Sequence, residues 1–215
     1  MGKIVLATII ISGSAKWLLK VGGNKEKWYG SDRIFMYVMT VFGAMTVNYS
    51  EQCTEYGRVV SNLRLLAGCL LAGGLLSAAY MDRRNCWVYN YVWWWCLPWA
   101  GILGLTAGGG FHGIVAVLVF VMLQQLLFSR MYGKADCHAF SVCALAECGN
   151  AVGMVGFLLQ MFLSVVLLTI VQLFRGNVTP RGRLREPQPF IPYIITAFFS
   201  VTFLESVFRT TYIYA

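Results

Sequence analysis

The chain alternates between apolar runs and short polar stretches along its whole length. The apolar runs cover 1–19, 34–49, 65–81, 90–107, 111–128, 137–149, 151–174 and 189–208. Crossing a bilayer takes about 20 residues, with a range of roughly 17–25. The runs 34–49 and 137–149 are therefore short, and we expect them to be tilted, half-embedded or extended into their flanks. Because no run shows useful alternation of period two, the pattern predicts an all-α, polytopic transmembrane helix bundle.

The composition agrees with a protein of the lipid bilayer. The chain has 215 residues, of which 58% are hydrophobic and 12% are charged, and its mean hydropathy is +0.65. A soluble domain carries about 25% charged residues. The net charge of +8 comes from basic residues in short loops between apolar runs. This distribution argues against a nucleic-acid partner, which would favour a basic stripe.

The loop charges also predict a topology. If every run spans the membrane, one side holds 13 of the 17 Lys and Arg residues, and the positive-inside rule assigns that side to the cytoplasm. Both termini would then lie outside a cytoplasmic (cell) membrane. In 1–19 the positive charges follow the apolar run, which favours a retained anchor over a cleaved signal peptide. The 13 residues are Lys16, Lys20, Lys25, Lys27, Arg33, Arg83, Arg84, Arg130, Lys134, Arg175, Arg181, Arg183 and Arg185.

Two carboxylates fall on the predicted cytoplasmic side. Asp82 ends the run 65–81, and Asp136 stands between a small-residue turn and the run 137–149. An ionisable residue at the mouth of a membrane segment is a functional candidate. Two nearby carboxylates that share a proton could activate water and polarise a carbonyl group. In the alternative interpretation each aspartate forms an interfacial ion pair with Arg83, Arg84 or Lys134.

Other chemistries find less support in the sequence. The seven cysteines include no Cys-x-x-Cys pair, and no His-Glu-x-x-His motif is present, so we expect no metal site. Cys137 and His138 are adjacent and would point in different directions on one helix, which disfavours a cysteine peptidase. A transporter could use buried carboxylates as an ion site, but the two halves of the chain show no inverted repeat.

Three short motifs resemble a known family. From Asp82 the chain reads Asp-Arg-Arg-Asn-Cys-Trp-Val-Tyr-Asn90, from Gly133 it reads Gly-Lys-Ala-Asp-Cys-His138, and the last run opens with Pro189-Phe-Ile-Pro-Tyr193. Together they resemble the type IV prepilin peptidases and the related archaeal preflagellin peptidases.

In that family an aspartate precedes the Asn of an Ile-Pro-Asn motif by eight residues, as Asp82 precedes Asn90. A second aspartate ends a Gly-x-Gly-Asp motif that is usually followed two residues later by Lys. Here Ala135 replaces the second Gly and His138 replaces that Lys. The closing Pro-Phe-x-Pro-Phe element is matched except for Tyr193 at its last position.

The resemblance covers roughly 65–208 and implies a six-helix peptidase core in 65–215, preceded by one or two membrane-associated apolar segments in 1–64. It implies an aspartyl endopeptidase that uses no cofactor and cleaves the short basic leader of a prepilin-like protein near the cytoplasmic membrane face. Without a Cys-x-x-Cys pair, the chain looks like a form that lacks the methyltransferase region. The alternatives are a non-catalytic relative and a transporter that uses the same carboxylates as an ion or proton site. The resemblance implies Asp82 and Asp136 as the catalytic pair, and Gly133, Ala135, His138, Asn90, Pro189 and Pro192 as substrate-binding or site-shaping residues.

Overall fold

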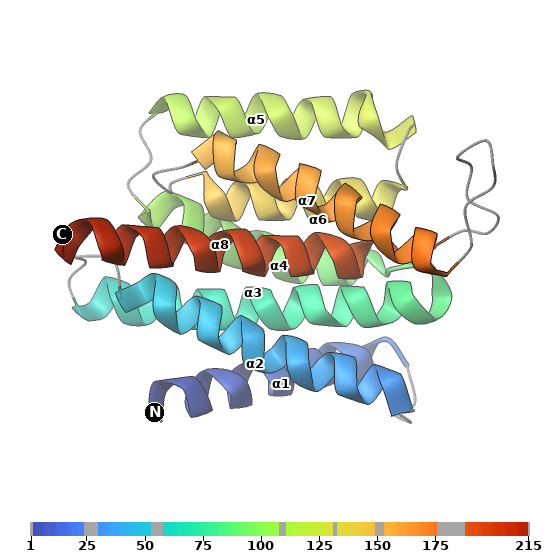
Figure 1. The fold of residues 1–215 in the computed structure, drawn as a ribbon, viewed down its shortest axis with the longest axis horizontal. Coiled ribbons are helices and arrows are strands. Elements are labelled where there is room, and N and C mark those ends of the chain that lie inside the picture. Colours follow the sequence, from blue (N-terminus) through green and yellow to red (C-terminus); the bar gives the residue numbers. More distant parts are fainter. Residues whose placement is uncertain are drawn as a thin grey trace.

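The computed structural model describes residues 2–23, 30–52, 58–107, 111–130, 133–148, 153–175 and 188–214. These ranges are helical almost throughout and show no strand, which confirms the all-α prediction. Successive helices run in opposite directions, so both termini lie at the same end of the bundle (Figure 1). The elements are α1 (Gly2–Val21), α2 (Gly30–Gln52), α3 (Arg58–Asn85), α4 (Asn90–Thr106), α5 (Phe111–Leu126), the short 3-10 helix η1 (Phe128–Arg130), α6 (Lys134–Glu147), α7 (Gly153–Phe174) and α8 (Ile191–Tyr214).

Four of these helices are long and apolar enough to cross a membrane. The stretches are Gly2–Val21, Val59–Asn85, Val155–Phe174 and Ile191–Phe208, and the shorter Gly113–Leu126 is also apolar. Large apolar side chains such as Phe174, Val155 and Leu126 are more than half exposed on the outside of the bundle. In water such a surface would be costly, whereas a bilayer accommodates it. The bundle is therefore that of a membrane protein.

Several helix boundaries differ from the predicted apolar runs. The expectation that the short run 34–49 extends into its flanks is confirmed, because α2 has 23 residues and includes the polar residues Ser31, Asp32 and Arg33. The run 65–81 lies inside a 28-residue helix, so Asp82 belongs to the last turn of α3. Helix α6 is short, as predicted, but it begins at Lys134 and places Asp136 in its first turn. In each case polar residues at the end of an apolar run stay helical.

Helix α3 lies at the centre of the bundle and packs against α1, α2, α4 and α8. Small residues of α3, among them Gly73 and Gly74, allow this close packing. A Cβ atom on Gly73 would collide with Ser14 of α1, and one on Gly74 would lie 2.5 Å from the sulfur of Cys96 in α4. Because α1 and α2 pack directly on α3, the N-terminal segments are part of the same bundle.

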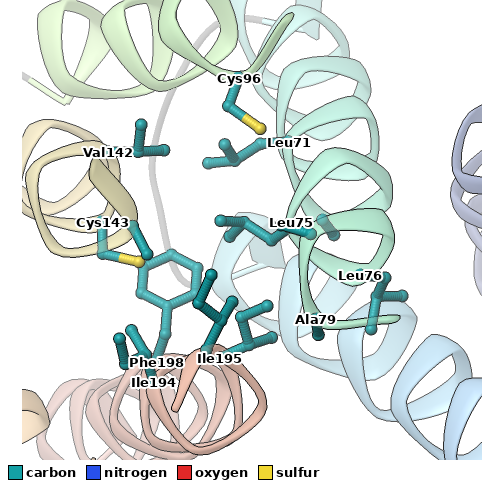
Figure 2. Packing of buried hydrophobic residues seen from close by; sticks show 14 of the residues in the cluster. Leu71, Leu75, Leu76, Ala79, Cys96, Val142, Cys143, Ile194, Ile195 and Phe198 are labelled. Atoms are coloured by element: carbon teal, nitrogen blue, oxygen red, sulfur yellow. The ribbon is translucent and has the colours of Figure 1, made fainter. Parts of the chain in front are cut away.

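One part of the buried core lies between α3, α4, α6 and α8 (Figure 2). Buried side chains from all four helices meet there, namely Leu71, Leu75, Ala79, Cys96, Val142, Cys143, Ile194, Ile195 and Phe198. A partly buried hydrogen bond joins two of these helices, because the Thr202 hydroxyl donates to the buried Glu147 over 2.7 Å. The core thus fixes the relative positions of the four helix ends that carry the candidate site.

Candidate active site at one end of the bundle

The first aspartate is set in place by the way in which α3 ends. Cys86 follows the helix with φ of 50°, a left-handed conformation that reverses the chain and is more usual for glycine. Its amide donates a 2.8 Å hydrogen bond to the backbone oxygen of Asp82. After three further residues the chain enters α4 at Asn90. This tight reversal holds Asp82 and Asn90 at the same end of the bundle.

The carboxylate of Asp82 is buried, with 6% of the residue exposed, and faces the start of α8. Its Oδ2 atom accepts a 2.9 Å hydrogen bond from the amide of Ile191, the first residue of that helix. The first amides of a helix lack partners within the helix and carry the positive end of its dipole, so they favour a negative charge. Pro192 has no amide hydrogen to offer. The Pro-Phe-Ile-Pro stretch thus presents Ile191 as the donor.

The second aspartate lies in the first turn of α6. The amide of Gly133, the N-cap residue, donates a 3.2 Å hydrogen bond to Oδ2 of Asp136. A Cβ atom on residue 133 would lie only 3.1 Å from the same oxygen, which explains a glycine here without any unusual backbone angle. Burial raises the pKa of Asp136 to about 7, the nearby charge of Asp82 adds to the rise, and the Gly133 hydrogen bond partly offsets it. Near neutral pH, Asp136 therefore exchanges readily between its protonated and ionised forms.

Asp82 and Asp136 line one cavity of about 510 Å³. Four other predicted site residues line the same cavity, namely Gly133, Ala135, His138 and Asn90. The two predicted prolines, Pro189 and Pro192, instead line a neighbouring cavity of about 550 Å³, and Gln188 borders both. The fold therefore gathers six of the eight predicted residues around one cavity and places the other two on the far side of the segment that leads into α8.

His138 lies beside the aspartates as a partly buried ring. Its centroid is 6.0 Å from that of Trp93, and its Nδ1 atom lies 3.4 Å from the amide nitrogen of Gln125. Burial lowers the pKa of His138, and the positive charge of Lys134 lowers it further. The imidazole is therefore neutral at pH 7 and does not supply the positive charge of the lysine that the family usually has at this position. Lys134, which also lines the cavity, brings a cation to it.

Metal ligands do not cluster in the part of the chain that the structure describes. No group of three or more His, Cys, Asp or Glu residues there could hold a metal ion. Cys137 is fully buried, and the side chain of His112 lies outside the described residues. The polar side chains that line this cavity include two carboxylates, an imidazole and an ammonium group, together with the thiol of Cys86 and the amides of Asn90 and Gln188.

Comparison with protein-family models, curated proteins and solved structures finds no match to this chain. The geometry of the cavity and the three motifs are therefore the features that point to a function.

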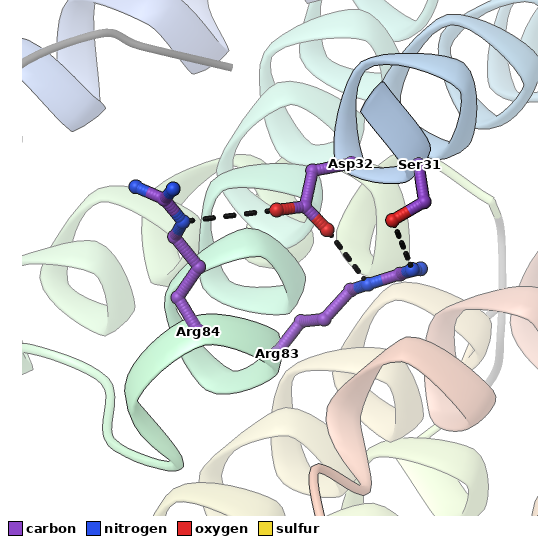
Figure 3. Close-up of polar contacts among 4 residues, drawn as sticks. All are labelled: Ser31, Asp32, Arg83 and Arg84. Atoms are coloured by element: carbon purple, nitrogen blue, oxygen red, sulfur yellow. Dashed lines mark hydrogen bonds and ion pairs between the residues drawn. The ribbon is translucent and has the colours of Figure 1, made fainter. Parts of the chain in front are cut away.

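Sequence reasoning missed Asp32, the residue that binds the two arginines next to Asp82. Its carboxylate oxygens lie 2.9 Å from Nε of Arg83 and 3.7 Å from Nε of Arg84 (Figure 3). Both arginines thus form ion pairs with a residue of α2. One interpretation of the sequence had paired them with Asp82 instead. Asp32 stands in a polar stretch ahead of an apolar run, so the hydropathy pattern gave it no weight.

Proposed function

We propose that this protein is a membrane-embedded aspartyl endopeptidase that cleaves the leader of a prepilin-like protein. The observation that carries the proposal is the shared cavity of Asp82 and Asp136. These residues lie on α3 and α6, 54 positions apart in the sequence, and the charge of the first raises the pKa of the second. Electrostatic coupling of this kind is the basis of a proton-sharing carboxylate pair.

The surroundings of the two aspartates favour different roles. Asp82 accepts an amide hydrogen bond at the positive end of α8, which stabilises an ionised carboxylate. Asp136 is the better proton donor, because burial and the charge of Asp82 hold its pKa near 7. We therefore assign Asp82 as the general base and Asp136 as the general acid.

These roles give a balanced hydrolysis step. Asp82 takes a proton from a water molecule while the water oxygen bonds to the carbonyl carbon of the scissile peptide. Asp136 gives its proton to the carbonyl oxygen, which forms a neutral tetrahedral intermediate. When the carbon–nitrogen bond breaks, Asp82 gives its proton to the leaving nitrogen and Asp136 recovers a proton from the oxygen. Both carboxyl groups then stand as they began, and no cofactor takes part.

The family resemblance suggests the substrate class. Helix α3 ends, and α6 and α8 begin, at the same end of the bundle (Figure 1). The residues that line the cavity come from this end. The cavity is lined by exposed Trp87 and Lys134 as well as by buried Asp82, so it joins the core to the polar end of the bundle. A leader peptide that precedes an apolar helix would bring its cleavage site to such a boundary. Cleavage would then take place at the membrane surface rather than at its midplane.

The test is cleavage of a co-expressed prepilin-like substrate by wild type, Asp82→Asn and Asp136→Asn. Each change is close to isosteric and removes one titratable carboxyl group. Glu147→Gln is the matched control, because Glu147 is a buried carboxylate on the same helix as Asp136 and lies outside the cavity. We expect both aspartate variants to reach the membrane in normal amounts and to lose cleavage, while the control retains it. Cleavage by either aspartate variant would reject the catalytic pair.

A further inference from the structure

The sequence contains three aspartates, and the fold brings all of them to one end of the bundle. Asp82 and Asp136 line one cavity, Asp32 lines the next, and Gln188 borders both. Asp32 comes from α2, in the part of the chain that the family resemblance leaves unexplained. Because Asp32 lies so close to the other two aspartates, its charge could do more here than help α2 to pack.

The contacts of Asp32 show where its charge acts. It lies between the guanidinium groups of Arg83 and Arg84, and the neighbouring Ser31 accepts a 3.5 Å hydrogen bond from Arg83 (Figure 3). The Arg83 guanidinium also lies 5.0 Å from the ring centroid of Phe35, one turn further along α2. The first turns of α2 thus hold both arginines on the side of α3 that faces α2.

These arginines directly follow Asp82 in the last turn of α3, so they are its nearest cations in the sequence. A guanidinium within about 4–6 Å lowers the pKa of a carboxyl group by roughly 1–3. Such a shift would leave both aspartates of the pair ionised at neutral pH. In the described part of the chain, the other polar groups around the pair include Cys86 from α3, Asn90 from α4, Lys134, Cys137 and His138 from α6, Gln188, and the amides of Gly133 and Ile191.

We propose that Asp32 is a positioning residue, which holds Arg83 and Arg84 away from Asp82 and balances one of their charges so that the aspartate pair keeps its shared proton. This inference rests on the proposed peptidase function. It also gives α2 a role in the site, because the segment ahead of the six-helix core then sets the pH range in which the core works.

Variants that change the charge next to the aspartate pair test this role, because they should shift the pH dependence of cleavage in opposite directions. Asp32→Asn makes the surroundings of the pair more positive by one charge and should lower the pH at which cleavage falls off on the alkaline side. Arg83→Gln makes them more negative by one charge and should raise that pH. The double variant restores the original charge and should return the profile to that of wild type. Because these side chains are partly exposed, we expect shifts of about 0.5–1 pH unit, which correspond to a threefold to tenfold change in rate on that limb.

A second readout does not depend on cleavage. Protein labelled with carbon-13 at the aspartate carboxyl groups should give three titrating NMR signals. The Asp32→Asn variant should keep only the signals of Asp82 and Asp136. We expect the midpoints of these two signals to move down in Asp32→Asn, up in Arg83→Gln and back in the double variant. Glu205→Gln serves as the control for loss of a remote charge, because Glu205 lies in the second half of α8, away from the end that carries Ile191.

The outcomes separate this inference from the proposed function. Midpoints that move in opposite directions and return in the double variant support the role of Asp32, even if wild type cleaves no prepilin-like substrate. Midpoints that stay within 0.2 pH unit of wild type in both single variants would overturn it, whether or not the protein is a peptidase. An Asp32→Asn shift that Arg83→Gln does not reverse would also overturn it, because a purely structural loss cannot be repaired by removing the arginine.

Discussion

The amide of Ile191 donates a 2.9 Å hydrogen bond to the buried carboxylate of Asp82, although 109 residues separate the two in the sequence. The bond joins the last turn of α3 to the first turn of α8. It also aims the positive end of the α8 dipole at one member of the aspartate pair. This contact stabilises the ionised form of Asp82, and together with the raised pKa of Asp136 it supports the assignment of base and acid.

Replacement of Ile191 with proline removes this donor. Proline is tolerated at the first position of a helix, so α8 can still form. A hydrogen bond to a charged group contributes about 1.5–3 kcal/mol, which corresponds to roughly a tenfold to hundredfold effect. We expect Ile191→Pro to lower kcat for leader cleavage by at least about tenfold, with a smaller change in KM, measured with purified protein in detergent or lipid discs.

Ile191→Ala is the matched control, because it removes the same buried side chain and keeps the amide. Loss of an isoleucine side chain from a packed core costs about 2–5 kcal/mol, so both variants should melt earlier than wild type. The folded fraction of Ile191→Ala should still cleave at a rate close to that of wild type. Equal kcat values for the two variants would show that the amide of Ile191 does not matter for the reaction.

The raised pKa of Asp136 predicts how stability depends on pH. The folded protein holds this proton up to a pKa of about 7, whereas the unfolded chain releases it near 3.8. Because the folded state binds more protons between these values, its stability falls as the pH rises from about 4 to about 7. The Asp136→Asn variant lacks this titrating group, so its stability should not show this fall. The Tm of the variant minus the Tm of wild type should therefore increase as the pH rises. Thermal melts followed by tryptophan fluorescence from pH 4 to 8 would measure the gain, and a constant Tm difference would contradict it.

The fold and most of the site could be predicted from the sequence because both leave local signals. Long apolar runs identify membrane helices, and the Gly-x-x-Asp turn marks the start of α6. The spacing from Asp82 to Asn90 reflects one tight reversal between α3 and α4, so both residues line the same cavity. These features depend on neighbours within about ten residues, which a single sequence can show.

What the sequence could not show depends on contacts between distant segments. Asp32 has no signal of its own, because it matters only where α2 meets the end of α3. The left-handed conformation of Cys86 was also hidden, since glycine is the residue that usually marks such a turn. The polar ends of α2 and α3 were placed outside the apolar runs because hydropathy cannot tell a helical polar turn from a loop. The separation of Pro189 and Pro192 from the aspartate cavity likewise appears only in three dimensions.

The position of Asp136 depends on close contact between α4 and α6. A Cβ atom on Gly104 of α4 would collide with the backbone oxygen of Leu145 in α6 and would lie 2.6 Å from the sulfur of Cys148. Backbone cannot move aside as a flexible side chain can, so Gly104→Ala must push α6 away from α4. Overpacking of this kind costs about 1–3 kcal/mol. We therefore expect a lower Tm, together with slower cleavage, because α6 carries Asp136 at its other end.

Gly101 offers a control on the same helix, because a Cβ atom there would meet nothing within 4 Å. Alanine is the better helix former by roughly 0.5–1 kcal/mol, so Gly101→Ala should raise the Tm slightly and leave cleavage unchanged. The two variants make the same chemical change three residues apart and should move stability in opposite directions. If Gly104→Ala is as stable and as active as Gly101→Ala, α4 and α6 do not pack as closely as described, and the placement of Asp136 beside Asp82 fails with them.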